Sequence, residues 1–460
     1  MIATTEILRP WLEEFEVFHR RAGGPEWLRE LRAEAFASFS KLGFPTTKDE
    51  DWRFTSVRGI ANTAFHLAPE LPAKLPGEGL PQSPPGIGAA LIFVNGQLVP
   101  PPGGREPLPA GVVVKGLKEA LGGPEGGELE RHLGRYEPVD GDAFTALNTA
   151  FLRQGAYVRV PRGTVVERPV YLLYVSTPAG VAQMTHPRNL ILIEEGAQAT
   201  VVEDYLTLGE WPAEGISSFT NAVTELVAGE NATVAHFLVK REGDGAAHVS
   251  TLRIEQQRSA NVAAHAVLLG GALVRNNVHP VLAGEGGECL INGFFLGQGS
   301  QHLDNYMKVE HRAAHGQSRQ FYSGILDGEA RGVFHGRIIV HPDAQKTDAK
   351  QTNRNLLLSD ATQMDTKPQL EIYADDVKCT HGATIGQMDE TALFYLRSRG
   401  VPEAEARALL LYAFAHENLE RMKPAVVRDW LAELITRHLP AAAAQPPGKG
   451  AAERSGPEAG

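Results

Sequence analysis

The feature that most constrains this chain is a long stretch, from Asp142 to about Leu370, built of short β-branched runs rather than helices. The clearest runs are Ala156–Val160, Val170–Val175, Leu190–Ile193, Ala199–Val202, Ala232–Val239 and Gly332–Val340. Many short strands fit a sandwich, a large barrel or a β-solenoid. The repeated order of strand, glycine turn, small residue and strand favours the solenoid, in which each coil buries its face on the next. Because the turn spacing is irregular, the other two architectures stay open at this stage.

The flanks of this stretch are predicted to be helical. Near the N-terminus, apolar residues recur at three- and four-residue spacing from Leu28 to Leu42, and Gly43 ends the run. A Pro/Gly-rich linker is expected from about Leu71 to Gly88. Asn95-Gly96 between apolar runs then predicts a β-hairpin.

Three helices are predicted after the β region. Asp389 is a candidate N-cap for the first, and Pro402 and Pro424 open the second and third. The final stretch is rich in Ala, Pro and Gly and is expected to be disordered. We therefore predict an N-terminal helical region with linker, a hairpin with a Pro/Gly-rich connection, a β core, a C-terminal helical domain and a tail, at residues 1–90, 91–141, 142–375, 376–440 and 441–460.

Composition excludes several classes of protein. The 460 residues carry 44 Lys+Arg against 55 Asp+Glu, a formal charge of −11, which disfavours a nucleic-acid binder. No apolar run reaches the roughly 20 residues that span a bilayer, and the first residues lack the apolar stretch of a signal peptide. Two cysteines, Cys289 and Cys379, are too few for a disulfide framework or for a four-cysteine metal site built by this chain alone. We expect a cytoplasmic protein with no membrane attachment.

The motifs of common enzymes are missing. The sequence has no GxxxxGK[ST] phosphate loop, no GxGxxG opening a helix after a strand, and no GxSxG nucleophile elbow. The chain is therefore not expected to hydrolyse ATP itself.

Cys379-Thr380-His381 is the segment with the most suggestive chemistry. On an extended strand, alternate residues point the same way, so the thiol and the imidazole could converge on a soft metal or a persulfide sulfur. Only two ligands are present, so such a site would need a partner chain or a small thiol to complete it. The alternative is a buried structural cysteine beside a hydrogen-bonded histidine.

Three segments carry the most specific motifs of the sequence: Ala344–Asn353 with Leu356–Ser359, Lys367–Thr384, and the predicted helix Leu393–Gly400. They resemble the SufB/SufD family of iron–sulfur cluster assembly proteins, and the resemblance spans about Gly43 to Met422. Weaker matches are Pro45 with Glu50–Arg53, and Phe144–Ala150. Within the family, the segment Asp375–Thr384 is most like SufD.

The resemblance implies a right-handed parallel β-helix flanked by N- and C-terminal helices. It also implies a non-catalytic scaffold that pairs with a SufB-like subunit through the β-helix and docks a SufC-like ATPase through the C-terminal helices. No cofactor is expected to bind stably to this chain alone, although a transient iron–sulfur cluster could form at the partner interface. The resemblance leaves room for a homodimer when SufB is absent.

The resemblance also implies roles for particular residues. His381, with Cys379 beside it, matches the position at the SufB–SufD interface implicated in cluster building, where both are expected to be metal ligands shared with the partner. Contacts to the ATPase are expected from the first C-terminal helix, at Leu393, Phe394, Leu396, Arg397 and Arg399. Packing within the chain is the alternative role for the apolar members of this set. Cys289 is expected to be a core residue of the solenoid.

Two other functions remain open on sequence grounds. One is a β-solenoid enzyme acting on polysaccharide, although only 7% of the chain is aromatic and no carboxylate pair stands in an aromatic context. The other is a stand-alone metal-binding module.

Overall fold

A computed structural model describes residues 2–68, 80–81, 83–101, 106–136, 140–209, 211 and 215–440. The chain divides into two compact units, Met1–Ile385 and Gly386–Gly460. The predicted tail at 441–460 lies outside the described residues, as does most of the predicted linker at 71–88. Among the described residues, no helix has both the length and the apolar character needed to span a membrane.

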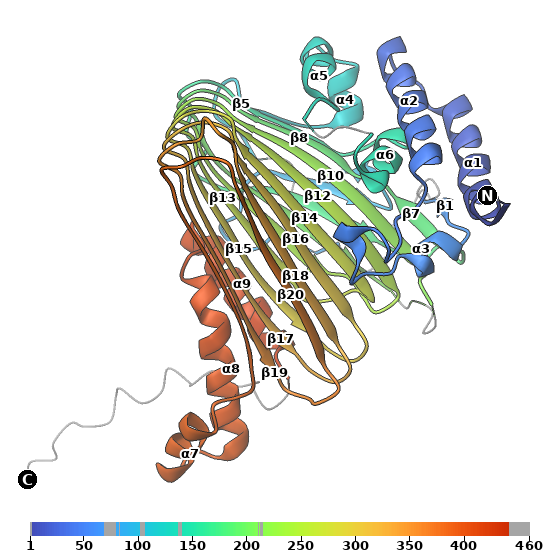
Figure 1. The fold of residues 1–460 in the computed structure, drawn as a ribbon. Helices are drawn as coiled ribbons and strands as arrows, with labels where there is room; N and C mark the ends of the chain where they lie inside the picture. The colour runs from blue at the N-terminus through green and yellow to red at the C-terminus, as the bar shows by residue number, and fades with distance from the viewer. Residues whose placement is uncertain are drawn as a thin grey trace, which may run out of the picture. The chain divides into compact units, whose positions relative to one another are not determined.

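The first unit is a parallel β-helix with two long sheets (Figure 1). One sheet contains β4 (Val113–Gly116), β5 (Ala156–Val160), β8 (Arg188–Ile193), β10 (Ser218–Ala228), β12 (Ala246–Gln256), β14 (Leu273–Leu282), β16 (His302–His311), β18 (Arg331–Val340) and β20 (Gln363–Ile372), with β1 (His66–Leu67) and β7 (Gln183–Thr185) beside β10. The other contains β3 (Gln97–Val99), β2 (Ala90–Val94), β6 (Val170–Ser176), β9 (Gln198–Thr207), β11 (Thr233–Arg241), β13 (Asn261–Leu268), β15 (Glu288–Gly297), β17 (Gln317–Leu326), β19 (Asp348–Leu357) and β21 (Lys378–Gly386).

Successive long strands of the chain alternate between the two sheets, and each pairs in parallel with the strand one coil earlier. This winding confirms the predicted solenoid and excludes the sandwich and the barrel. Each coil buries its inward side chains against its neighbours, and the central strand β12 is almost wholly buried.

Glycines permit this close stacking. A Cβ added to Gly293 would lie 2.0 Å from the Tyr322 ring on the next coil, so the ring occupies the space that a larger residue would fill. Gly328 turns between β17 and β18 with φ +69°, a backbone conformation that glycine adopts at little cost.

The beginning of the β-helix is covered. The predicted hairpin is confirmed, because Asn95 (φ 48°) and Gly96 (φ 74°) join β2 and β3 antiparallel. The hairpin's β2 extends the sheet beside β6, and β4 pairs antiparallel with β5. The connection predicted at 91–141 also contains α4 (Leu117–Leu121) and α5 (Gly126–His132), which local Gly and Pro content did not suggest. Their Leu117 and Leu129 are buried in a cluster with Leu28, and this tertiary packing explains why helices form there.

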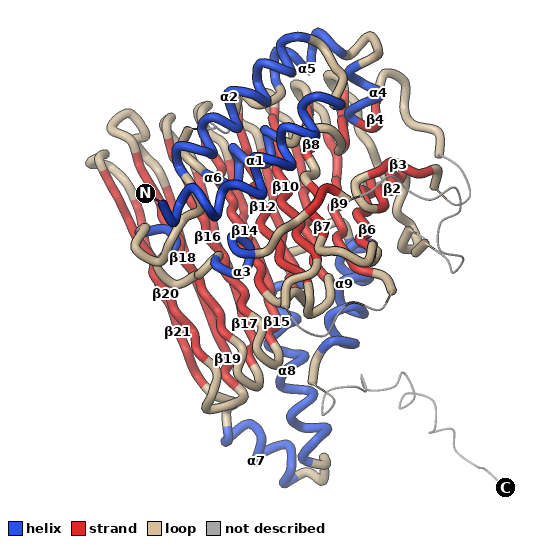
Figure 2. The backbone as a smooth tube through the Cα atoms, turned by 90° about the vertical axis from the view of Figure 1, so that its right-hand side faces the viewer, coloured by secondary structure: helices blue, strands red, loops and turns tan. Residues whose placement is uncertain are grey.

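Helices of the N-terminal region lie along one side of the β-helix (Figure 2). They are α1 (Ile2–Arg21), α2 (Glu26–Leu42), the short η1 (Glu50–Trp52), α3 (Arg58–Asn62) and α6 (Ala143–Ala150). An aromatic core joins them to the sheet: the rings of Phe15 and Phe36 stack at 4.0 Å, and Trp11 meets Phe219 of β10 edge to face at 6.2 Å. Trp52 lies over the Arg275 guanidinium at 4.3 Å, so the segment around Glu50–Arg53 is fixed on the outer face of the sheet.

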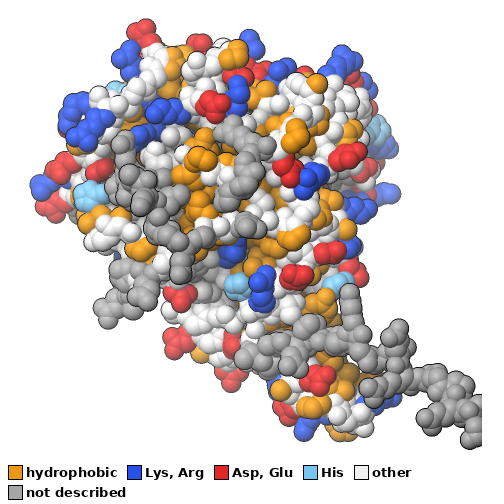
Figure 3. Space-filling view, turned by 180° about the vertical axis from the view of Figure 1, so that it is seen from behind, with side chains coloured by type: hydrophobic (Ala, Val, Ile, Leu, Met, Phe, Trp, Pro, Cys, Tyr) orange, Lys and Arg blue, Asp and Glu red, His pale blue; other side chains and the backbone are white. Residues whose placement is uncertain are grey.

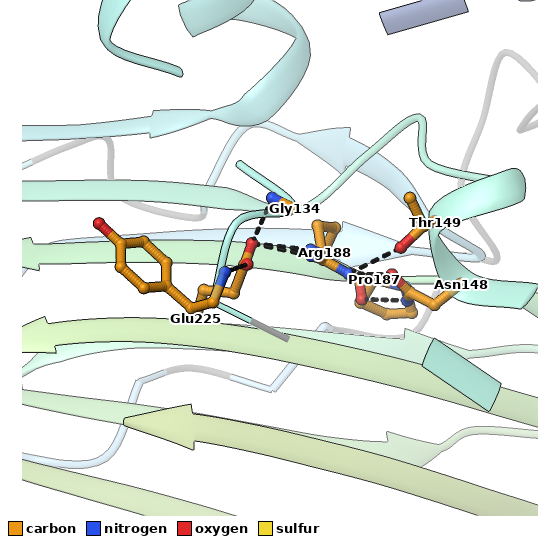
Figure 4. Close-up of polar contacts among 7 residues, drawn as sticks. Gly134, Asn148, Thr149, Pro187, Arg188 and Glu225 are labelled. Carbon is orange, nitrogen blue, oxygen red and sulfur yellow. Dashed lines mark hydrogen bonds and ion pairs between the residues drawn. The ribbon is translucent and has the colours of Figure 1, made fainter. Parts of the chain in front are cut away.

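A buried ion pair fixes α6 to the first coils (Figure 4). Arg188 and Glu225 have no exposed side-chain surface, and an Arg188 nitrogen lies 2.8 Å from the Glu225 carboxylate. Arg188 also donates to Thr149 Oγ1 at 3.1 Å, while Asn148 donates to the Pro187 carbonyl oxygen at 2.8 Å. Backbone N–H groups, including that of Gly134 at 2.9 Å, donate to Glu225. The Phe144–Ala150 motif therefore connects helix and solenoid.

The second unit contains α7 (Glu390–Ser398), α8 (Glu403–Leu419) and α9 (Ala425–His438). The Asp389 side chain accepts hydrogen bonds from the N–H groups of Thr391 and Ala392, which confirms it as an N-cap. Pro402 and Pro424 precede α8 and α9, as predicted. The predicted start of the helical domain at 376 was too early, because β21 continues the β-helix to Gly386.

Candidate functional site

The last coil of the β-helix is the most exposed part of the solenoid. β20 and β21 are the terminal strands of their sheets, and each has a neighbouring strand on one side only. Residues of the central strands are buried, whereas β20 is mainly half-buried and β21 almost entirely exposed. The unit thus ends in open strand edges whose backbone N–H and C=O groups can pair with another chain.

Apolar side chains accompany these open edges. Ile372 is 40% exposed, Tyr373 61% and Ile385 47%, in a coil whose earlier counterparts bury such residues. Sequence reasoning missed these three, because an apolar residue on an edge strand looks the same as one in the core. Together with the backbone edges they form an incomplete sheet surface.

Cys379 and His381 both lie on β21. The Lys378 N–H donates to the Thr347 carbonyl oxygen at 2.8 Å, and Asn355 on β19 donates to the Thr384 carbonyl oxygen at 3.3 Å, so β21 stacks directly on β19. Cys379 packs partly against the solenoid core. His381, two residues further along and about 7 Å away along the backbone, is exposed, and strand alternation predicts the same side of the strand for both side chains. Both residues lie on the terminal strand of their sheet.

The two thiols differ in environment. Burial raises the pKa of Cys289 to about 12, and its side chain is 2% exposed, as expected for a core residue. Partial burial also raises the pKa of Cys379, while a hydrogen bond from the Ala349 backbone acts in the opposite direction. Both cysteines are free thiols, and Cys379 is the more accessible.

A metal site at this position would be incomplete within the chain. Over the described ranges, no group of three or more His, Cys, Asp or Glu side chains is arranged to hold a metal ion. Cys379 and His381 can supply two ligands of the kind that iron and sulfur chemistry uses, a soft thiolate and an imidazole. The remaining ligands would have to come from outside this chain.

The residues predicted for ATPase contact lie on α7, in the second unit, and separate into two groups. Leu393 is 2% exposed and packs inside the helical unit, and Leu396 is half-buried. Phe394 is 72% exposed, Arg397 pairs with Glu403 at 3.3 Å, and Arg399 lies 3.6 Å from the Tyr395 ring centre. Tyr395, 55% exposed, was not predicted and belongs to the same exposed face. A large exposed aromatic pair flanked by arginines is typical of protein contacts.

The fold and these surfaces define a class of protein: a β-helix subunit with an open strand edge and a separate helical unit that exposes aromatic residues. Comparison with known proteins gives the family. A family model described as the SUF system FeS cluster assembly SufBD core domain matches residues 174–414, and one for the SufBD protein N-terminal region matches residues 19–172. The chain belongs to the SufBD family of iron–sulfur cluster assembly proteins.

Curated relatives agree with this family. The chain is 31% identical to the iron–sulfur cluster assembly protein SufD of Escherichia coli over 88% of this chain and 91% of that protein. It is 30% identical to a SufBD family protein of Synechocystis over 92% of this chain and 91% of that one. SufD of Bacillus subtilis is 28% identical over 65% of this chain and 67% of its own length. A role in iron–sulfur cluster assembly follows, and the polysaccharide-enzyme alternative has no support from the family.

Proposed function

We propose that this chain is a non-catalytic scaffold subunit of a SufBCD-type complex. The open edges of β20 and β21 pair with a SufB-like β-helix, and the exposed face of α7 docks a SufC-like ATPase. The observation that carries the proposal is the exposed last coil of the solenoid. The central strands of this β-helix are buried, and its first coil is extended by β2, so the last coil is the part left open for a partner.

Cys379 and His381 are proposed to contribute to the cluster-building site at this junction. They stand on the terminal strand, so a partner strand added beside β21 would place its own side chains next to them. Two ligands from this chain and the rest from the partner fit the incomplete site. The iron and sulfide are cargo in this scheme and do not stay bound to the isolated chain.

The test is co-purification of the tagged chain with a SufB-like subunit and a SufC-like ATPase. Ile385→Lys should weaken capture of the SufB-like subunit at least tenfold, because it places a charge in the new sheet contact. Val181→Lys is the matched control, since Val181 is 54% exposed elsewhere on the solenoid. Equal capture by both variants, or no capture by the unmodified chain, would refute the pairing.

The exposed face of α7 is tested separately. Arg397→Glu with Arg399→Glu should reduce capture of the ATPase and leave the SufB-like subunit bound. Arg437→Glu, on the exposed side of α9, serves as the control. Loss of the ATPase in the control alone would move the docking surface away from α7.

The cluster site is tested in the intact complex. His381→Ala should leave the complex assembled but lower the iron and sulfide recovered with it after co-expression, and Cys379→Ser tests the thiol separately. Normal iron and sulfide content in both variants would remove these residues from the cluster site.

A further inference from the structure

A pair of amide side chains inside the β-helix leads toward its open end. Gln320 on β17 and Gln351 on β19 are register partners on successive coils, and both are buried. Gln351 Nε2 donates a hydrogen bond to Gln320 Oε1 at 3.0 Å. Stacked, in-register amides form a ladder that continues from strand to strand while the next strand offers a partner. Gln351 is the member of the pair next to the terminal strand β21.

The Gln351 amide is enclosed between the two sheets. Burial alternates along β19, so Gln351 faces inward while Lys350 before it faces out. Charged side chains likewise lie over the outer surface of the molecule, as the face drawn in Figure 3 shows. Gly336 on β18, in the opposite sheet, leaves room for the amide, because an added Cβ there would overlap Gln351 Nε2. The fold therefore makes a place for this polar group inside the solenoid.

The side-chain oxygen of this amide is left without a donor. Gln351 Oε1 is buried and accepts no hydrogen bond from any described residue. A buried amide oxygen without a donor is costly, so a donor is expected to complete the ladder. Within a ladder, each amide donates to one neighbour and accepts from the other. Because Gln351 Nε2 already donates to the coil before, the missing donor belongs to the coil after, which is β21.

The register of β21 on β19 follows from its backbone hydrogen bonds. One coil earlier, the Asp348 N–H donates to the Gly316 carbonyl oxygen at 3.0 Å, and Asp348 is the register partner of Gln317, the residue after Gly316. The Lys378 N–H donates to the Thr347 carbonyl oxygen at 2.8 Å in the same way. Lys378 therefore stands beside Asp348, the residue after Thr347.

This register brings His381 next to Gln351. Each lies three residues further along its strand from the pair that Lys378 makes with Asp348. Neighbouring strands are about 4.8 Å apart, and residues paired across them carry their side chains on the same side of the sheet. An imidazole has at least one ring N–H. The residue in register with the unpartnered Gln351 oxygen is therefore one that can donate to it.

We propose that Gln351 is a positioning residue for His381. As a partner covers β21, the exposed imidazole turns toward the last coil, and one ring N–H donates to Gln351 Oε1. The other ring nitrogen then keeps its lone pair for iron at the junction. This inference rests on the proposed function, and it adds the residue that sets the tautomer and the direction of the histidine there.

The test compares two substitutions of Gln351 in the full chain, co-expressed with a SufB-like subunit and a SufC-like ATPase. Gln351→Met has nearly the same shape but no acceptor, and should lower the iron and sulfide recovered with the complex by about tenfold. Gln351→Glu keeps an acceptor and should retain most of both. Its carboxylate can also accept from Gln320 Nε2, which has no partner among the described residues. A residue that only filled space would give the opposite order, because methionine is apolar and glutamate buries a charge.

A double variant and a control show whether Gln351 acts through His381. His381→Ala/Gln351→Met should lose no more iron and sulfide than His381→Ala alone. Asn353→Leu changes a buried amide on the same side of β19, beside Ala383 in the same register, and should leave both near the level of the unmodified complex. Urea midpoints of the variants check that each chain is folded.

The outcomes separate this inference from the proposed function. Normal iron and sulfide in His381→Ala would overturn the proposed cluster site, and this inference with it. Low content in His381→Ala with normal content in Gln351→Met would overturn the positioning role alone. So would a further loss in the double variant, an equal loss in Asn353→Leu, or a Gln351→Met chain that does not fold.

Discussion

The two ends of the β-helix are completed in opposite ways. At the beginning, β4 and the β2–β3 hairpin extend the sheets, and helices and an aromatic core cover the first coils. At the other end, β20 and β21 stop with open edges, exposed apolar residues and the Cys379–His381 pair. One chain thus carries a covered end that supplies stability and an uncovered end whose sheet surface is unfinished.

This difference indicates where changes should matter for folding and where they should matter for assembly. Changes at the covered end and in the central coils should lower stability. Changes in the last coil should leave the chain folded and alter what it binds. The predictions below test that division, beginning with the largest expected effect.

Arg188→Met should cost about 3–5 kcal/mol of unfolding free energy, because it leaves the fully buried Glu225 without its cation. Urea denaturation followed by circular dichroism measures the loss. The double variant Arg188→Met/Glu225→Met should recover part of it. Arg162→Met removes an exposed pair with Glu195 and should cost under about 1 kcal/mol. Similar losses in both single variants would contradict a special role for the covered end.

Gly293→Ala and Gly382→Ala compare a central coil with the last one. The new methyl group at Gly293 would collide with the Tyr322 ring, with an expected loss of about 1–3 kcal/mol in the same urea assay. No atom lies within 4 Å of a Cβ at Gly382 on β21, so that variant should change stability by less than about 0.5 kcal/mol. A larger loss at Gly382 would show that the last coil is as closely packed as the centre.

Lowering the pH should destabilise the folded chain, because some of its buried histidines are neutral in the folded state. His265 on β13 is 2% exposed and stacks on Phe237 at 4.5 Å; burial, and then the neighbouring His236, lower its pKa to about 3. Below its usual pKa of about 6.5, the unfolded chain takes up a proton that the folded chain does not, so stability falls as the pH drops.

For such a group, the free energy of unfolding falls by up to about 1.4 kcal/mol for each pH unit between about pH 6.5 and 3. Urea midpoints measured from pH 7 to 4 should be less pH-dependent in His265→Phe. An unchanged slope would mean that this histidine does not contribute.

The smallest effect is expected when the reactivities of the two cysteine thiols are compared, because alkylating them is not expected to change the fold. Iodoacetamide at pH 8 should label Cys379 of the native chain more slowly than an unperturbed thiol, since its raised pKa leaves less thiolate. Cys289, buried and with a pKa of about 12, should stay unlabelled until urea is added. Peptide mass spectrometry distinguishes the two sites. Faster labelling of Cys289 would reverse the inferred order of accessibility.

Much of this architecture could be predicted from sequence where the signal is local. Asn95-Gly96 correctly predicted the hairpin, and Asp389 correctly predicted the start of α7. The short strands separated by glycine turns correctly indicated the solenoid. The boundary at 376 failed because β21 has little strand character of its own. It forms because β19 offers it an edge to stack on, through contacts such as Lys378 N–H to Thr347 O.

The candidate site was predictable in part. The spacing of Cys379 and His381 predicts that their side chains point to the same side of a strand, and the resemblance to the family suggests the role proposed for them. The exposure of Ile385 and Tyr395 could not be deduced, since only the assembled coils and helices decide which apolar residues remain uncovered.

The position of the open edge late in the sequence also has a consequence for synthesis. Chains leave the ribosome N-terminus first, at about 5–20 residues per second, and domains begin to fold as they emerge. The covered coils can therefore assemble before β20 and β21 are made. The particular surface of β20 and β21 is made only after the coils that support it, so a partner that recognises this surface meets a β-helix whose earlier coils are already present.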